Sequence, residues 1–505
     1  MRLSETQRAF PISNGMEKFY ITTTLPYVNA RPHLGFALEA VQADIIARYE
    51  RLKGKEVIFN TGTDEHGLKI YRKAEEEGLD VQTYVDQKAA DFEKLKGALN
   101  LSYTHFIRTT DPRHVAAAQE FWKRCEKDIE KRTYQTKYCV GCELEKTDSE
   151  LDHGHCVLHP NLEIETIEEE NYFFLFSRYE KPLLELYEKT YHFVLPDTRL
   201  EEITSFVRGG LKDFSISRLK TKMPWGVPVP GDPDQVMYVW FDALVNYIST
   251  LGWPIDSATS TKLSTSQGKP SQFDDFWPGL QVAGKDNLRQ QAAMWQAMLL
   301  SANLPMSKQI LIHGHITSAG QKMSKSLGNV VDPLEVVQRY GTDALRYWLA
   351  REANTFEDSD FTWGKFHEAY NGNLVNGLGN VVSRIIGMAH LYSIDTKTAE
   401  PTELASELQI KMDDYNLKKA GDLIWEELNA LDRYIQETVP FKTIKTDEEK
   451  ARADVLYLLQ ELWKITIRLE PFLPQTSHKI LSALETNQPI EPLFPRIPYT
   501  PSTSH

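Results

Sequence analysis

Two short segments far apart in the chain carry side chains suited to phosphate chemistry. The first, His33-Leu34-Gly35-Phe36, follows a run of strand-forming residues and opens a helix. A helix N-terminus carries unpaired N–H groups and the positive end of the helix dipole, so it favours an anion. Gly35 would let a flat base or a phosphate approach closely, and His33 can donate a hydrogen bond. A capping or surface role for His33 is the alternative that this segment alone leaves open.

The second segment reads Lys-Met-Ser-Lys-Ser over residues 322–326 and lies between two nearby glycines. Two ammonium groups on such a loop can close on a polyphosphate and neutralise the charge that develops on a leaving pyrophosphate. Lys322 and Lys325 are therefore candidate catalytic residues. A solvated basic loop is the alternative interpretation.

A third group of residues has the spacing of a metal site: Cys139, Cys142, Cys156 and His159. Three thiolates and one imidazole suit a closed tetrahedral Zn²⁺ site with a structural role. A redox dithiol formed by Cys139 and Cys142 is the alternative, and His153 or His155 could replace His159 as the fourth ligand.

The elements that must position these residues follow from the apolar pattern. Residues 17–27 are rich in β-branched and aromatic types and predict a strand. Apolar residues from Leu38 recur at three- and four-residue steps, which predicts a helix that ends near Gly54. Residues 56–60 predict a second strand. Strand, helix and strand in this order are typical of a βαβ unit in a parallel sheet, which binds ligands at the carboxyl ends of its strands.

The pattern changes twice further along the chain. Residues 130–235 contain the Cys pairs, short strand-like runs and Pro-rich turns, and are predicted to be an insertion. Strand-like runs at 237–241 and 310–312 are predicted to complete the sheet. Beyond residue 366 the pattern is helical. The predicted fold is α/β, a Rossmann-like doubly wound parallel sheet that is split by a zinc-binding insertion and followed by an α-helical bundle.

Composition and charge narrow the functional classes. With 505 residues, 41% apolar and 25% charged, the chain has ordinary globular composition and room for several domains. Its net charge of −14 argues against unspecific coating by nucleic acid. No run is long and apolar enough to span a membrane, and no signal peptide is evident, so a soluble, cytoplasmic protein is expected. Four cysteines exclude a disulfide framework, and Cys125 is expected to be a buried apolar residue.

Taken together, the segments 33–36 and 322–326 resemble the two signature motifs of class I aminoacyl-tRNA synthetases. Four further segments resemble methionyl-tRNA synthetases, in the same order along the chain: 24–29, 62–67, 238–244 and 284–286. The resemblance extends from about Lys18 to the 490s. It implies methionine–tRNA ligase activity, in which L-methionine and ATP form methionyl-adenylate and the methionyl group is then transferred to the 3′ end of tRNA(Met).

The resemblance implies a role for individual residues. His33, Lys322 and Lys325 would contact the transition state. The ATP site would contain His33, Gly35, Gly284, Asp286, Lys322 and Lys325, with Mg²⁺ bound to the ATP. The methionine pocket would contain Leu25, Tyr27, Asp64, Trp240, Ala243, Leu244, Tyr247 and Gln291, with Asp64 paired to the ammonium group. The anticodon would be read by Asn380 and Arg384, four residues apart on one helix face, and by Phe441.

Three positions depart from the family pattern: Phe36 and Gln291 replace a usual His, and Phe441 replaces a usual Trp. We expect the activity to survive these changes. A non-catalytic tRNA-binding scaffold and a class I ligase for another amino acid are the alternatives. The predicted division is 1–127 and 237–330 for the halves of the catalytic domain, 128–236 for the insertion, 331–365 for a linking segment and 366–505 for the anticodon-binding domain. A monomer is expected because the chain ends after the helical part.

Overall fold

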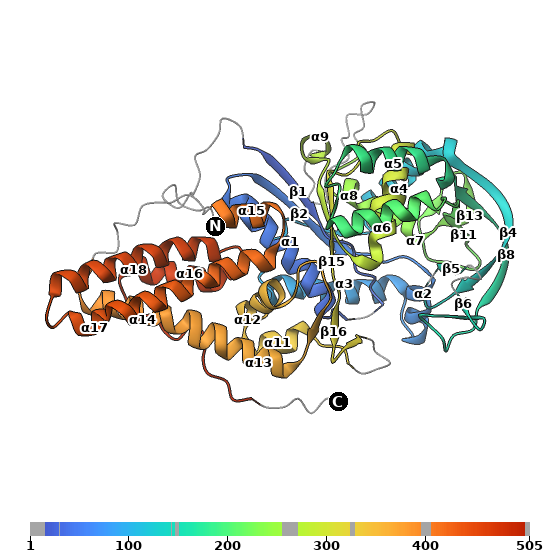
Figure 1. The fold of residues 1–505 in the computed structure, drawn as a ribbon. Coiled ribbons are helices and arrows are strands. Elements are labelled where there is room, and N and C mark those ends of the chain that lie inside the picture. The colour runs from blue at the N-terminus through green and yellow to red at the C-terminus, as the bar shows by residue number, and fades with distance from the viewer. Residues whose placement is uncertain are drawn as a thin grey trace.

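A six-stranded, wholly parallel sheet forms the centre of the computed structural model, which describes residues 16–29, 31–142, 144–146, 151–254, 271–323, 329–394 and 406–499 (Figure 1). The strand order is β3-β2-β1-β14-β15-β9. The strands are β1 (Lys18–Thr22), β2 (Glu56–Thr63), β3 (His105–Arg108), β9 (Val194–Leu195), β14 (Leu280–Gly284) and β15 (Gln309–His313). The order reverses between β1 and β14, which makes their carboxyl ends the expected ligand-binding edge.

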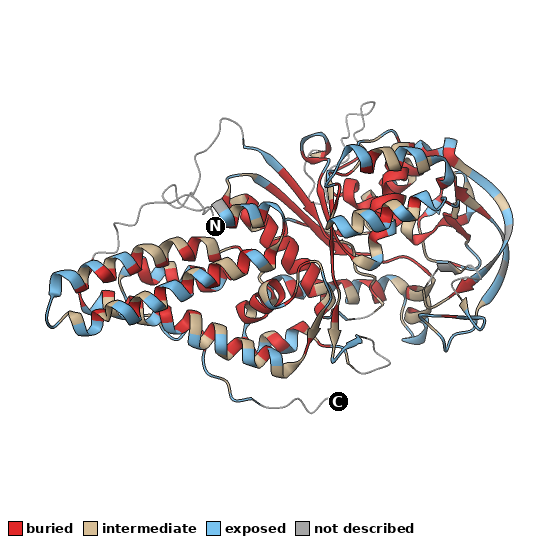
Figure 2. Ribbon diagram, viewed as in Figure 1, coloured by how far each residue is buried: buried red, intermediate tan, exposed pale blue. Residues whose placement is uncertain are grey.

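Apolar side chains alternate between the two faces of this sheet. Phe19 and Ile21 of β1 lie in one apolar core, together with Leu311 of β15. Tyr20 and Ile312, one position along each strand, lie in a second core. Because successive residues of a strand point to opposite faces, this alternation requires helices on both sides of the sheet. Figure 2 shows the buried residues concentrated where these helices meet the strands.

Helices cover both faces, as the doubly wound prediction requires. The first core contains residues of α1 (Leu34–Leu52), α3 (Val81–Ala98), α11 (Pro333–Tyr340) and α12 (Thr342–Tyr347). The second contains residues of α4 (Pro112–Cys125), α7 (Val239–Leu244), α8 (Asn246–Ser249), α9 (Phe273–Phe276) and α10 (Trp295–Ser301). The short α2 (Leu68–Glu76) contacts α3. Gly54 follows α1 with a φ of 86°, which confirms the predicted helix end.

The segment between the two halves of the sheet carries small antiparallel sheets. One contains β10 (Phe214–Ser215), β8 (Glu165–Phe174), β4 (Ile129–Cys139) and β5 (Leu144–Lys146). Another contains β11 (Ser217–Leu219), β13 (Asp232–Met237) and β12 (Pro228–Val229), and a third contains β6 (Leu151–Asp152) and β7 (His155–Cys156). Helices α5 (Glu180–Lys189) and α6 (Asp197–Arg208) also lie in this segment. Its strand β9 pairs with β15 and forms the edge of the central sheet.

The prediction of a strand at 237–241 is wrong. Strand β13 ends at Met237 in a separate sheet, and α7 begins at Val239. A short apolar run does not distinguish a buried strand from a buried helix. Here a tertiary contact favours the helix, because the carboxylate of Asp242 accepts hydrogen bonds from two buried histidines.

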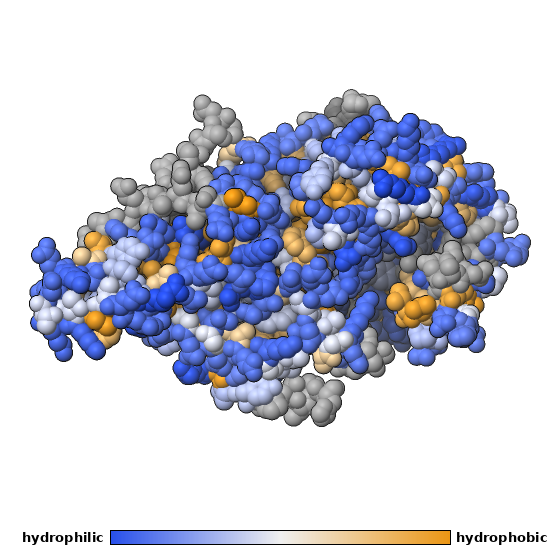
Figure 3. Space-filling model, in the orientation of Figure 1, coloured by the Kyte–Doolittle hydropathy of each residue, from blue (hydrophilic) through white to orange (hydrophobic). Residues whose placement is uncertain are grey.

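The C-terminal part is a helical bundle beside the sheet (Figure 1). It contains α13 (Trp363–Ala369), a π-helical turn (Tyr370–Gly379), α14 (Asn380–Leu391), α15 (Ser406–Asp413), α16 (Leu417–Thr438), α17 (Pro440–Thr443), α18 (Glu448–Leu469) and α19 (Pro474–Thr486). Its apolar residues belong to the same core as α1, so bundle and sheet pack as one body. The outer surface seen in Figure 3 is mainly hydrophilic. Every helix of the described part is too short or too polar to cross a bilayer.

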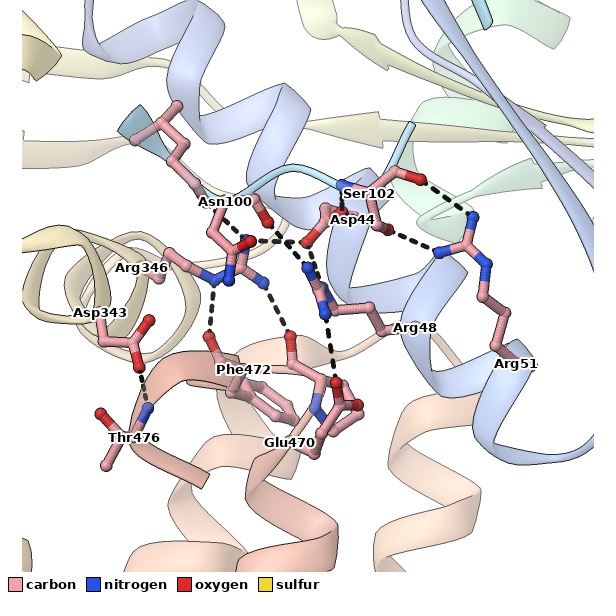
Figure 4. Close-up of polar contacts among 12 residues, drawn as sticks. Asp44, Arg48, Arg51, Asn100, Ser102, Asp343, Arg346, Glu470, Phe472 and Thr476 are labelled. Atoms are coloured by element: carbon pink, nitrogen blue, oxygen red, sulfur yellow. Dashed lines mark hydrogen bonds and ion pairs between the residues drawn. The ribbon is translucent and has the colours of Figure 1, made fainter. Parts of the chain in front are cut away.

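A buried ionic cluster joins the bundle to the first helix of the sheet domain (Figure 4). Asp44 of α1 and Arg346 of α12 form an ion pair of 2.8 Å, and neither side chain is exposed. Arg346 also donates to the carbonyl oxygen of Phe472 at 2.9 Å, and Arg48 binds both Asp44 and Glu470. Burial alone would raise the pKa of Asp44, but the charges of Arg346 and Arg48 outweigh it and lower that pKa.

Candidate active site and metal centre

A cavity of about 480 Å³ opens at the carboxyl ends of β1, β2, β14 and β15, around the point where the strand order reverses. Every residue predicted for the ATP and methionine sites that the structure describes lines this cavity. These residues are Leu25, Tyr27, His33, Gly35, Asp64, Trp240, Ala243, Leu244, Tyr247, Gly284, Asp286, Gln291 and Lys322. Lys325 lies outside the described residues. The cavity therefore unites segments that are far apart in the sequence.

His33 is the N-cap of α1, as the alternative interpretation proposed, and it also faces the cavity. Its Nδ1 accepts a hydrogen bond of 3.0 Å from the backbone N–H of Gly35. A side chain at position 35 would collide with the His33 ring, since a Cβ there would lie 2.9 Å from Cε1. Gly35 thus lets His33 cap the helix. With Nδ1 acting as acceptor, the neutral ring carries its proton on Nε2.

The expectation that α1 presents unpaired backbone N–H groups is wrong. The N–H of Leu34 donates to the carbonyl oxygen of Val331 at 3.2 Å, and the N–H groups of Phe36 and Ala37 donate to the carbonyl oxygen of His33. With Gly35 capped by the imidazole, the first turn is saturated. Hydrogen bonds to an anion must therefore come from side chains, while the helix dipole still favours negative charge.

Lys322 supplies positive charge on the same side of the cavity. It lies in β17 (Gln321–Lys322), which pairs with β16 (Ile316–Ser318), and β16 pairs in turn with β18 (Ser359–Phe361). The cavity walls lower the pKa of His33 by desolvation, and the charge of Lys322 lowers it further. His33 is therefore a neutral donor at neutral pH, and Lys322 is the cation beside it.

Asp286 follows β14, lines the same cavity and is held ionised there. Its Oδ1 lies 3.1 Å from Nε2 of His315. Burial would raise the pKa of Asp286, but the hydrogen bond and charge of His315 and the charge of Lys322 lower it to about 2. Asp358 orients this wall by accepting from the backbone N–H of His315 at 2.9 Å and from Lys285 at 2.7 Å.

A buried ion pair at the cavity was missed by the sequence analysis. His313, at the end of β15, donates from Nδ1 to the carbonyl oxygen of Gly314 at 2.7 Å and from Nε2 to Glu39 at 2.9 Å. Glu39 also accepts from both the N–H and the hydroxyl of Thr24. Burial would lower the pKa of His313, but Glu39 outweighs it and raises that pKa. The pair joins β15, α1 and the segment after β1.

The apolar end of the cavity is formed by α7 and α8. Trp240, Ala243 and Leu244 of α7 and Tyr247 of α8 line it. Asp64 reaches the same space from the end of β2, where its N–H donates to the carbonyl oxygen of Pro26 at 3.0 Å. A wall of aromatic and aliphatic side chains with a carboxylate at its rim suits an amino acid with a polarisable apolar side chain, whose ammonium group can pair with the carboxylate.

A second polar cluster fixes α7 from behind. The carboxylate of Asp242 accepts from Nδ1 of His66 at 2.5 Å and from Nε2 of His114 at 2.8 Å. Nδ1 of His114 in turn lies 2.9 Å from the hydroxyl oxygen of Ser249. Burial would raise the pKa of Asp242, but the two histidines lower it to about 2. Since His66 follows Asp64 closely, this cluster ties the loop of Asp64 to the aromatic wall.

The four residues predicted to bind a metal come together, and their donor atoms lie within 4.8 Å of one another. Sγ of Cys142 is 3.3 Å from Sγ of Cys156 and 3.2 Å from Nδ1 of His159, and Sγ of Cys139 is 3.8 Å from Nδ1 of His159. A tetrahedral site with Zn–S bonds of about 2.3 Å has donor separations of roughly 3.5–3.8 Å, so these donors fit.

The cluster of Cys139, Cys142, Cys156 and His159 borders the cavity. Gly141 and Cys142 lie in the cavity wall, and the carbonyl oxygen of Gly141 accepts from Lys69 at 3.4 Å. Position 141 must be glycine, because a Cβ there would lie 2.5 Å from the ring of His159. His153, an alternative fourth ligand, is not among the clustered donors, and its side chain is 95% exposed.

Two family models match the chain. One, described as tRNA synthetases class I (M), matches residues 19–161 and 144–386. The other, described as the anticodon binding domain of methionyl tRNA ligase, matches residues 395–493. The chain belongs to the methionine–tRNA ligase family of class I synthetases.

Individual members of the methionine–tRNA ligase family match the chain over most of its length. The methionine–tRNA ligase of Synechocystis sp. is 40% identical over 493 residues, which span 94% of this chain and 90% of the relative. The chloroplastic/mitochondrial methionine–tRNA ligase of Arabidopsis thaliana is 38% identical over 93% of this chain and 77% of its own length. A solved structure of Mycobacterium tuberculosis methionyl-tRNA synthetase in complex with methionyl-adenylate has a TM-score of 0.84 at 34% identity, covering 92% of this chain and 93% of the other.

Two of the three departures from the methionine–tRNA ligase pattern, Phe36 and Gln291, are accommodated locally. Phe36 packs edge-to-face on Phe92 with ring centroids 5.2 Å apart, and both rings line the cavity. Gln291 lies in a π-helical turn (Gln290–Met294), is buried, and donates from Nε2 to the hydroxyl oxygen of Tyr247 at 2.7 Å. Each replacement therefore has a partner.

The residues predicted to read the anticodon lie on the helical bundle. Asn380 is exposed at the start of α14, and Arg384 of the same helix forms an ion pair of 2.6 Å with Asp432 of α16. Phe441 of α17 is 45% exposed. Helices α14 and α17 both pack against α18, and α17 lies at the end of the bundle far from the sheet (Figure 1).

Proposed function

We propose that the cavity binds L-methionine and ATP side by side and catalyses formation of methionyl-adenylate, which the chain then uses to charge tRNA(Met). One observation supports the proposal: the carboxylate of Asp286, the neutral donor His33 with the cation Lys322, and the ring of Tyr247 all line a single cavity. These groups suit a nucleoside triphosphate and an apolar amino acid bound together in one space.

The first step needs positioning and charge stabilisation more than covalent help. A carboxylate oxygen of methionine attacks the α-phosphorus of ATP, the bond from that phosphorus to the bridging oxygen breaks, and pyrophosphate leaves with the electron pair. His33 donates from Nε2 to a phosphate oxygen, and Lys322 and Lys325 neutralise the leaving pyrophosphate. ATP enters as its Mg²⁺ complex, which supplies further positive charge at the phosphates.

The substrates are held by their polar ends. Asp286 accepts from the ribose hydroxyls of ATP, Gly284 allows the nucleoside to lie against the strand end, and Gly35 keeps the mouth open beside His33. Asp64 pairs with the methionine ammonium group. Leu25, Tyr27, Trp240, Ala243, Leu244, Tyr247 and Gln291 surround the side chain. In the second step a ribose hydroxyl of the tRNA 3′ end attacks the methionyl carbonyl carbon, and AMP leaves.

We further propose that Cys139, Cys142, Cys156 and His159 bind Zn²⁺ as a structural ion. A closed set of three thiolates and one imidazole leaves no position for substrate. When bound, the ion would crosslink a segment with few apolar contacts of its own, and so hold Gly141 and Cys142 in the cavity wall. Thiolates persist in a reducing compartment, which supports action in the cytoplasm.

The helical bundle is proposed as the anticodon-binding domain, corresponding to residues 366–505 of the predicted division. Asn380 offers an exposed amide to base edges, Arg384 offers the N–H groups of its guanidinium that its ion pair with Asp432 does not use, and Phe441 offers an exposed ring on which a base can stack. We propose the rest of the division as well: 1–127 and 237–330 as the halves of the catalytic domain, 128–236 as the insertion, which also supplies the edge strand β9 to the central sheet, and 331–365 as the link. We propose that the chain acts as a monomer.

Amino-acid-dependent exchange of pyrophosphate into ATP tests the proposal. The chain is expected to support exchange with methionine and not with leucine or cysteine. Exchange with leucine or cysteine alone would assign a different substrate, and no exchange with any amino acid would leave only a tRNA-binding scaffold. Charging of tRNA(Met) with labelled methionine by the same preparation tests the second step.

A further inference from the structure

Five buried polar side chains form one continuous hydrogen-bonded chain behind the aromatic end of the cavity. Each is at most 6% exposed. In order they are Gln296, Ser307, Gln281, Gln291 and Tyr247, of which only the last two line the cavity. Ser307 lies before β15, Gln281 lies in β14, and Gln296 lies in α10. Gln296, Ser307 and Gln281 therefore cannot contact a substrate directly and can influence it only through Gln291 and Tyr247.

The backbone fixes the direction of the hydrogen bonds at the start of this chain. The N–H of Ser307, which can only donate, binds Oε1 of Gln296 at 3.0 Å. Nε2 of Gln296 must therefore point the other way, and it donates to the hydroxyl oxygen of Ser307 at 3.0 Å and to the carbonyl oxygen of Gln291 at 2.8 Å. Because that carbonyl can only accept, a second backbone group requires the same orientation.

Each hydrogen bond then fixes which group donates in the next one. Since the Ser307 hydroxyl oxygen accepts from Gln296, its proton goes to Oε1 of Gln281. Nε2 of Gln281 donates to Oε1 of Gln291 at 3.2 Å, and Nε2 of Gln291 donates to the hydroxyl oxygen of Tyr247 at 2.7 Å. Reversal of any one amide would set two donors or two acceptors face to face, which costs free energy in a buried site.

The chain ends with the Tyr247 oxygen as an acceptor. Its hydroxyl proton therefore points away from Gln291. Burial raises the pKa of Tyr247, so the proton is retained at neutral pH. Tyr247 lines the aromatic end of the cavity, beside Trp240 and Leu244. The side chain of Asn246 also hydrogen-bonds Tyr247, and on the cavity side the O–H group can donate to an acceptor on whatever fills the pocket.

We propose that Gln296, Ser307 and Gln281 are specificity-determining positioning residues that fix the Tyr247 hydroxyl as a donor toward the substrate side chain. This inference rests on the proposed function. A thioether sulfur is a weak acceptor, whereas the methylene group that replaces it in norleucine accepts nothing. A pocket with a fixed donor therefore prefers methionine to its isosteric hydrocarbon analogue. Without this hydrogen-bonded network, the side-chain amide of Gln291 can reverse its orientation, and its Oε1 then accepts the hydroxyl proton of Tyr247.

The test compares kcat/KM for methionine with that for norleucine in pyrophosphate exchange. Ser307→Ala removes the relay hydroxyl, and Gln281→Leu removes a donor and an acceptor at nearly constant volume. Each is expected to reduce the methionine preference by about 3- to 10-fold, the effect of one neutral hydrogen bond. Ser301→Ala is the matched control, because that serine is equally buried but donates to Asp128 instead. It should leave the preference unchanged.

The same two substitutions in a Tyr247→Phe background distinguish a loss of orientation of the Tyr247 hydroxyl from a general disturbance of the pocket. Without the hydroxyl there is nothing left to orient, so Ser307→Ala and Gln281→Leu should no longer alter the preference. An equal loss of preference in both backgrounds, or an unchanged preference in the tyrosine background, overturns the inference. If the unsubstituted chain shows no methionine-dependent exchange, the proposed function fails instead. If either single variant does not fold, as judged by thermal unfolding, the other carries the comparison.

Discussion

The backbone N–H of Leu34 donates to the carbonyl oxygen of Val331 across 3.2 Å. Leu34 is the first residue of α1, and Val331 lies shortly after the Lys-Met-Ser-Lys-Ser segment. This bond joins the first signature segment to the stretch that follows the second one. The start of α1, where His33 lies, is therefore tied to the residues around Val331.

His33 combines two roles that substitution can separate. Asparagine can still cap α1 but is too short to replace the Nε2 donor, whereas alanine can do neither. His33→Asn should lower the rate of adenylate formation by about 100-fold while leaving the melting temperature unchanged. His33→Ala should show the same loss of rate and an additional loss of about 1 kcal/mol in stability. A His33→Asn variant with full activity would remove His33 from the proposed catalytic residues.

Lys322 should act on the rate and not on the fold, because its side chain is exposed at the cavity mouth. Lys322→Ala is expected to slow adenylate formation by about 100-fold in a single-turnover experiment with saturating methionine. Lys325→Ala should do the same. Lys308→Ala, an exposed lysine before β15, serves as the control and should retain its activity. Equal rates for the Lys322 variant and this control would contradict the assignment.

The buried ionic cluster joins the bundle to the sheet domain, so we expect Arg346→Met to lower the stability of the fold strongly. The substitution removes one of the two arginines that pair with the buried Asp44, together with the hydrogen bonds that Arg346 donates to the carbonyl oxygens of Phe472 and Pro471, and removal of one member of a buried ion pair costs about 3–5 kcal/mol. The midpoint of urea unfolding should fall accordingly. Lys189→Met is the control, since its ion pair with Glu185 is on the surface and should contribute at most about 0.5 kcal/mol. Similar midpoints for the two variants would show that the cluster does not hold the joint.

Much of this scaffold could be predicted because local patterns agree with the tertiary structure. The apolar steps from Leu38 and the Gly54 stop define α1, and the β-branched run after Glu56 defines β2. The run at 237–241 misled because its helical state depends on Asp242 meeting histidines from distant segments. No spacing rule within the run carries that information.

Cys139→Ser is expected to abolish or strongly reduce bound zinc in elemental analysis and to lower the stability of the insertion. Cys125→Ala is the matched control. Its thiol is buried away from the cluster and contacts the carbonyl oxygen of Met298, so zinc should be retained. Full zinc content in the Cys139 variant would refute the metal site.

The lowered pKa of Asp242 predicts that the stability of the fold depends on pH. Its pKa of about 2 in the folded chain lies below the usual value of about 3.9, so its carboxylate stabilises the fold above pH 4. That contribution is lost as the pH falls toward 2. Asp242→Asn should lower stability by about 2–3 kcal/mol at pH 7, with a smaller difference from the unsubstituted chain at pH 3. Asp274→Asn, at an exposed site, should have little effect at either pH. A difference for Asp242→Asn that does not change with pH would contradict this account.

The candidate site could be predicted only in part. Residues within recognisable segments, such as Asp64 and Gly284, were found and line the cavity. His313 and His315 could have been found as well, because they follow a predicted strand at its carboxyl end. Glu39 could not, because it lies in the middle of an apolar helix and its role depends on contacts with Thr24 and His313.

The most direct test of the account is a crystal structure of the chain with a non-hydrolysable sulfamoyl analogue of methionyl-adenylate. The account predicts the ribose beside Asp286, the linkage between the two halves beside His33, and the thioether within hydrogen-bonding distance of the Tyr247 hydroxyl. An analogue bound outside this cavity, or bound with its methionyl side chain directed away from Tyr247, would contradict it.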